Sequence, residues 1–122
     1  VQSATRENGI DRLLAEHDVV ALVAPSGPLA PRADPVNGDV WPDWAGAGYA
    51  AAIAGYPHLT VPMGTVRGIP IGLSFMGGKD QDAAILSLGY AYEQRTQARA
   101  EPRYYQTAED LPEIAEAMRR RD

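Results

Sequence analysis

The sequence predicts an α/β fold in which helices pack on a β-sheet. Segments with apolar residues at helical spacing alternate along the chain with short apolar segments that are typical of strands. The chain has 122 residues, about the usual size of one domain, and is long enough to bury a core. We expect a parallel crossover, a β-hairpin and flanking helices.

The first third of the chain predicts a helix, a strand and a long loop. Helical spacing begins at position 10 and relates Ile10, Leu13, Leu14 and His17. Residues 19–25, VVALVAP, form a continuous apolar run that is typical of a central strand covered on both faces. Residues 25–43 contain five prolines and no hydrophobic period. We therefore expect an ordered loop that lies over another part of the protein.

Residues 44–56, WAGAGYAAAIAGY, predict a buried helix because nearly all of them are small or apolar. Gly46 and Gly48 each cost about 1 kcal/mol relative to alanine, which loosens the start of this helix. Gly55 is expected to end the helix, and Pro57 prevents its continuation. A strand, a loop, a helix and a second strand in this order predict a right-handed parallel crossover.

Two alternating segments then predict a β-hairpin with a turn at Arg67 and Gly68. In residues 58–64 the alternation separates one face from Thr60 and Pro62, and in residues 69–75 it separates one face from Pro70, Gly72 and Ser74. The faces opposite these residues carry Leu59, Val61, Met63, Ile69, Ile71, Leu73 and Phe75. Because Pro62 has no backbone N–H, we expect it to face an edge, a bulge or a ligand.

The C-terminal part predicts a helix over residues 80–96, with Asp80 as its N-cap. Its apolar stripe comprises Ile85, Leu88, Gly89 and Tyr92, widened by Leu86 and Tyr90. A tail starts near Glu101. Its last helix, residues 110–120, has few apolar residues to bury and is expected to be marginal.

Composition excludes several classes of function. The net charge of −5 and the pI near 4.9 give no electrostatic reason to bind nucleic acid or anionic lipid. The chain has no cysteine, so disulfides and thiolate metal sites are excluded. No run approaches the roughly 18 apolar residues of a membrane span, and the first residues do not resemble a signal peptide. We expect a cytoplasmic location.

Catalytic and metal-binding patterns are weak at the level of single residues. His17 and His58 are the two histidines and are not spaced as a metal-ligating pair, so we expect no metal site. Ser74, in GLSFMGG, comes near a nucleophile elbow, but the second glycine is one residue late. A serine–histidine triad would require the fold to bring Ser26 or Ser74 to His58. A structural role for His58 at a strand entry is the favoured interpretation.

Several longer segments resemble one enzyme family. AGYPHLTVPMG, GIPIGLSFMGG and LGYAYEQRTQAR occur in this order and resemble the C-terminal portion of the amidase signature family, in its bacterial amidase and peptide-amidase-like branch. GIDRLLAEHDVVALVAPSG and PVNGDVW extend the similarity to most of the chain. The resemblance implies that the strands belong to the mixed central sheet of that fold. It also implies hydrolysis of carboxamides without a metal or an organic cofactor.

In that family a nucleophilic serine, a second serine in a cis peptide and a proton-shuttling lysine perform the reaction. This chain has no Ser-Ser pair, and its single lysine, Lys79, lies beside Asp80 and Asp82, where we expect it to be solvated. We therefore expect residues 1–122 to form a C-terminal segment, with a peripheral tail over 104–122 and no catalytic residue. Alone it would be inactive and prone to self-association. Its expected partners are the N-terminal part of the same amidase and a small amide substrate.

The resemblance also indicates which residues border the substrate pocket. The long loop and the start of the following helix carry Ser26, Asn37, Asp39, Trp41 and Trp44. Asp39 can accept hydrogen bonds from a substrate amide, and the tryptophans can wall an apolar pocket. An aspartate after Asn-Gly can equally cap local backbone. The alternative for the whole chain is a non-catalytic binding or interaction module with an amidase-like shape.

Overall fold

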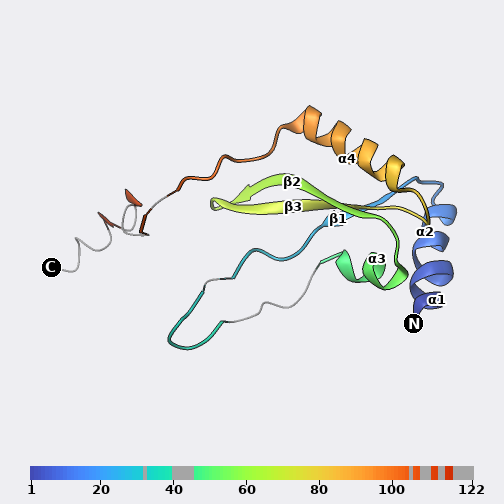
Figure 1. Ribbon diagram of the computed structural model, residues 1–122, viewed down its shortest axis with the longest axis horizontal. Helices are drawn as coiled ribbons and strands as arrows, with labels where there is room; N and C mark the ends of the chain where they lie inside the picture. Colours follow the sequence, from blue (N-terminus) through green and yellow to red (C-terminus); the bar gives the residue numbers. More distant parts are fainter. Residues whose placement is uncertain (32, 40–45, 105, 108–110, 113–114, 117–122) are drawn as a thin grey trace.

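The computed structural model describes residues 1–31, 33–39, 46–104, 106–107, 111–112 and 115–116. Helices lie on both sides of a three-stranded sheet, with α4 over one face and α3 beside the other (Figure 1). The elements in chain order are α1 (Gln2–Thr5), the π-helical turn η1 (Arg6–Ile10), α2 (Asp11–Glu16), β1 (Leu22–Pro25), α3 (Gly48–Ala54), β2 (His58–Val66), β3 (Ile69–Met76) and α4 (Asp82–Thr96).

The sheet has the order β1-β3-β2, and both outer strands pair with β3 in antiparallel orientation. β1 and β2 therefore run in the same direction and are joined through α3, as expected for a crossover, with β3 between them. The prediction that residues 19–25 form a central strand is wrong for this sheet. β1 begins only at Leu22 and lies at the edge, and Val23 is 57% exposed because α4 packs on β2 and β3.

The predicted hairpin of β2 and β3 is confirmed. Its two-residue turn has positive φ at both Arg67 (51°) and Gly68 (80°), the backbone pattern that matches the twist of paired strands. Pro62 pairs with Gly72 and Gly64 pairs with Ile71, so Met63 is an extra residue in β2. This β-bulge confirms one of the placements expected for Pro62, which has no N–H for the ladder.

Helix α4 covers one face of the sheet. Val61, Phe75 and Ile85 form the buried centre of this contact, and the rings of Phe75 and Tyr92 meet edge to face at 5.8 Å between centroids. The predicted stripe is confirmed except for its widening, because Leu86 and Tyr90 are 59% and 65% exposed.

The predicted N-cap of α4 is wrong. The helix starts at Asp82, after Gln81, and shows no side-chain cap hydrogen bond. Asp80 instead lies in the preceding turn with φ of 59°. The Gln81 side chain accepts a hydrogen bond of 3.1 Å from the Gly78 N–H, which stabilises this turn.

The opposite face carries a second core of Ile10, Ala51, Ala54 and Met76. Here the helical segment begins at residue 2, eight residues before the expected start, and it continues through the π-helical turn. His17, placed by its spacing on the apolar stripe, is exposed after the end of α2.

Helix α3 is shorter than the predicted span of 44–56 and only partly buried. It covers Gly48–Ala54, and both Tyr49 and Ile53 are exposed. Gly55 ends it in a left-handed conformation with φ of 69°, as predicted.

The tail after α4 leads away from the sheet (Figure 1). Most of the predicted helix over 110–120 lies outside the described residues, although Ala115 N–H donates to the Leu111 carbonyl at 2.9 Å. Of the helices in the described part of the chain, none has the length and apolar character to cross a bilayer. The expected boundary of a peripheral tail at residue 104 stays a prediction.

Candidate functional site

A polar cluster lies on the face of the sheet opposite α4. The hairpin register sets Thr60 of β2 beside Ser74 of β3, and His58 beside Met76. Ser26 follows the last residue of β1, where its backbone N–H donates to the Gly72 carbonyl at 2.8 Å. Alternate residues of adjacent strands share a face, so the side chains of Ser26, His58, Thr60 and Ser74 meet.

Hydrogen bonds connect these four side chains. His58 Nε2 lies 2.6 Å from Ser74 Oγ, and Ser74 Oγ donates to Ser26 Oγ at 2.8 Å. Ser26 Oγ in turn donates to Thr60 Oγ1 at 3.2 Å, and Thr60 Oγ1 is also 3.5 Å from Ser74 Oγ. We call these four residues the hydroxyl–imidazole cluster.

Two glycines make room for this cluster. A Cβ on Gly72 would lie 2.6 Å from Thr60 Cγ2 and 2.9 Å from Ser26 Oγ, so a side chain there would push the two hydroxyls apart. Gly48, the first residue of α3, faces the His58 ring, whose Cε1 is 3.5 Å from the position of a Cβ. The imidazole therefore fits between α3 and β3.

The direction of the hydrogen bonds limits the chemistry of the cluster. Ser74 uses its single O–H to donate to Ser26, and it therefore accepts from the Nε2–H of His58. A serine nucleophile would instead donate its proton to the imidazole. Ser74 is also 0% exposed, so its oxygen cannot attack a substrate from solvent in this conformation. The geometry fits the orientation of hydroxyl groups better than nucleophilic catalysis.

No feature of the sequence was expected to bring Ser26 or Ser74 to His58, and the structure brings both together. The signal was present in the hairpin. A two-residue turn at Arg67 and Gly68 fixes the register, and that register places Thr60 opposite Ser74. The position of Ser26 depends on the pairing of β1 with β3, which the crossover prediction did not supply.

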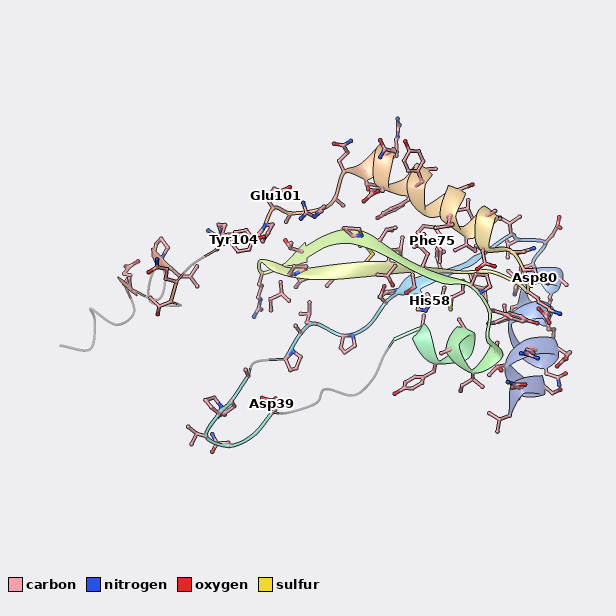
Figure 2. The ribbon with its side chains drawn as sticks, in the orientation of Figure 1. Asp39, His58, Phe75, Asp80, Glu101 and Tyr104 are labelled. Atoms are coloured by element: carbon pink, nitrogen blue, oxygen red, sulfur yellow. The ribbon has the colours of Figure 1, made fainter. Side chains whose placement is uncertain are left out.

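The other predicted pocket residues do not join the cluster. Asn37 Nδ2 donates to Asp34 Oδ2 at 2.9 Å, and Asp39 Oδ1 accepts from the Asp34 N–H at 3.1 Å. Asp39 thus caps local backbone, which is the alternative considered for it, and it lies on the loop away from His58 (Figure 2). Trp41 and Trp44 lie outside the described residues.

Charged groups near the N-terminal helices form a separate polar contact. Tyr56 donates its hydroxyl to Asp11 Oδ2 at 2.7 Å, and Arg6 Nε donates to the Ala54 carbonyl at 2.7 Å. The hydrogen bond to Asp11, with smaller effects of burial and of the carboxylate charge, raises the pKa of Tyr56. Among the described residues, no three histidine or carboxylate side chains gather as a group that can hold a metal ion.

Comparisons with known proteins identify relatives over most of the chain. No family model matches the sequence. A glutamyl-tRNA(Gln) amidotransferase protein from Lachnospira eligens is 35% identical over 95 residues, which are 72% of this chain and 19% of that protein. A probable amidase of Arabidopsis thaliana is 29% identical over 98 residues, or 80% of this chain and 16% of that protein.

Solved structures agree with these relatives. Native peptide amidase from Stenotrophomonas maltophilia matches with a TM-score of 0.73 and 42% identity, over 87% of this chain and 20% of that chain. A peptide amidase in complex with the competitive inhibitor chymostatin matches with a TM-score of 0.73 and 44% identity, over 84% and 20% of the two chains. The chain belongs to the amidase signature family, and it spans about a fifth of the length of these peptide amidases.

Proposed function

We propose that the chain forms part of the central sheet and part of the substrate pocket of an amidase that hydrolyses carboxamides to carboxylate and ammonia. The observation that carries the proposal is the 42% identity to a peptide amidase over 87% of this chain. Because that relative is a peptide amidase, a peptide amide is the favoured substrate class.

The residues that perform the reaction are proposed to lie in another part of the enzyme. The family resemblance assigns catalysis to two serines and a lysine of other segments. Lys79 is exposed in the turn before α4. A lysine that acts as a base must be desolvated to lower its pKa, so this location supports a solvated, non-catalytic role.

Exposed apolar surface supports the proposal that the rest of the amidase covers this chain. A hollow of about 440 Å³ lies between the N-terminal helices, α3 and the sheet, and its apolar lining includes Ile10, Leu13, Leu22, Ala47 and Met76. Val23 on the outer strand β1 is exposed as well. Open apolar hollows and unpaired strand edges are typical of surfaces that another part of a protein covers.

A segment exchange tests the proposed function. The chain replaces the matching fifth of the Stenotrophomonas maltophilia peptide amidase, and ammonia release from a peptide amide is measured. We expect turnover by this chimera and none by a control from which the segment is deleted. A chimera that is folded by circular dichroism but inactive would contradict the proposal.

The isolated chain provides the second test. We expect it to release no ammonia from carboxamides and to self-associate in sedimentation, and we expect the separately produced N-terminal part of an amidase to suppress this association. Turnover by the isolated chain that survives Lys79→Ala would refute the division of roles. A soluble, inactive monomer would favour the independent binding module.

A further inference from the structure

We infer that Ser26 binds an N–H group of the substrate carboxamide, and that His58 and Ser74 are positioning residues that hold Ser26 Oγ for this contact. The inference rests on the proposed function and adds one specific interaction to it. It is carried by the hydrogen bonds of the hydroxyl–imidazole cluster, by the burial of Ser74 and by the position of Ser26 after β1.

The location of Ser26 suits a ligand contact. Ser26 follows the carboxyl end of β1 and starts the long connection to α3. In open α/β sheets, ligands bind outside the carboxyl ends of the strands. Ser26 is half-buried, whereas Ser74 is fully buried, so the cluster leads from the interior to an accessible hydroxyl.

Counting donors and acceptors defines what Ser26 can bind. A serine hydroxyl has one donor and two acceptor positions. The Ser26 donor is used by Thr60, and one acceptor position is used by Ser74. One acceptor position remains, and its complement is an N–H donor such as the NH₂ of a carboxamide. An ester of the same acid has no N–H at this position.

His58 and Ser74 set this polarity. Since the Nε2–H of His58 donates to Ser74, the Ser74 hydroxyl is directed to Ser26, and the Ser26 hydroxyl is directed to Thr60. Reversing the row would turn a donor of Ser26 toward Ser74 and change what Ser26 presents. Gly72 keeps Ser26 and Thr60 in contact over β3.

The test uses the peptide amidase chimera and compares a peptide amide with the corresponding methyl ester. Ser26→Ala is expected to raise KM for the amide about threefold to tenfold, the usual effect of one hydrogen bond, with kcat and the ester reaction nearly unchanged. Ser74→Ala is expected to raise the same KM and to add nothing in the Ser26→Ala background. Ser87→Ala is the matched control, because Ser87 lies on α4 and donates to the Ala83 carbonyl.

A conservative substitution separates positioning from base catalysis. The Nε2 of His58→Gln can still donate to Ser74, so KM for the amide is expected to stay within twofold, whereas His58→Ala is expected to behave like Ser74→Ala. A loss of about a hundredfold in kcat with His58→Gln would instead identify a general base and overturn the inference.

Other results would also overturn it. Equal losses on amide and ester, or additive effects of Ser26→Ala and Ser74→Ala, would show a general structural role. If Ser74→Ala does not fold, Ser74→Cys keeps the volume while it weakens both hydrogen bonds. A folded but inactive chimera without these substitutions refutes the proposed function itself, and this inference with it.

Discussion

The hydroxyl of Tyr56 donates a hydrogen bond of 2.7 Å to Asp11 Oδ2 and so ties the turn before β2 to helix α2. The contact joins residues that are 45 positions apart. It lies beside the core of Ile10, Ala51, Ala54 and Met76, against which Tyr56 packs. Loss of this contact should therefore loosen the N-terminal helices from the sheet.

Alkaline pH is expected to break this hydrogen bond. The carboxylate of Asp11 raises the pKa of Tyr56 above its ordinary value of 10.0 in the folded chain. The contact therefore stabilises the fold fully below pH 10, and this contribution is lost as the pH rises through the higher folded pKa. Absorbance titration should show one tyrosine that ionises late, and this step should disappear in Tyr56→Phe.

Tyr90→Phe is the control for this titration, because Tyr90 is exposed on α4. It should remove one tyrosine without removing the late step. A late step that persists in Tyr56→Phe would show that another tyrosine causes it.

Gly77→Ala is expected to destabilise the chain by overpacking. A Cβ on Gly77 would lie 2.7 Å from Cγ1 and 2.9 Å from Cδ1 of Ile85, which is almost completely buried in the core beneath α4. Overpacking of this kind typically costs about 1–3 kcal/mol. Gly27→Ala is the matched control, because no atom lies within 4 Å of a Cβ there. Urea unfolding of both variants should show a large loss for Gly77→Ala and none for Gly27→Ala.

Local sequence signals predicted the parts of the fold that depend on neighbouring residues. Alternation and the turn at Arg67 and Gly68 were sufficient for the hairpin, and Gly55 was sufficient for the end of α3. Pro62 correctly indicated an irregular position because a missing N–H limits strand pairing directly. The face of α4 followed from helical spacing alone, since Ile85 and Gly89 are buried.

Features that depend on long-range pairing were not predictable in this way. An apolar run such as residues 19–25 indicates a strand but not its place in the sheet, and β1 lies at the edge of the described strands. The hydroxyl–imidazole cluster needs the registers of both strand pairs at once. Ser26 and Ser74 are separated by 48 residues, and no spacing rule connects them.

Gly72→Ala is expected to disrupt the cluster by steric overlap. Its Cβ would meet Thr60 Cγ2 at 2.6 Å, and Thr60 is β-branched and stiff at χ1. We expect a lower melting temperature. The double variant with Thr60→Ser, which removes the overlapping methyl group, should recover part of that loss. Additive losses would show that the overlap with Thr60 is not the cause.

Val23→Lys is expected to reduce self-association of the isolated chain. Val23 lies in the edge strand β1, which α4 leaves uncovered because it packs on β2 and β3, and its side chain is exposed. A lysine on an edge strand opposes pairing with another chain because its charge would have to be desolvated. Sedimentation velocity at several concentrations should show a larger monomer fraction for Val23→Lys. Val36→Lys makes the same change at a position that is 87% exposed in the loop, and it should associate like the unsubstituted chain. If both variants suppress association equally, net charge rather than the β1 edge is responsible.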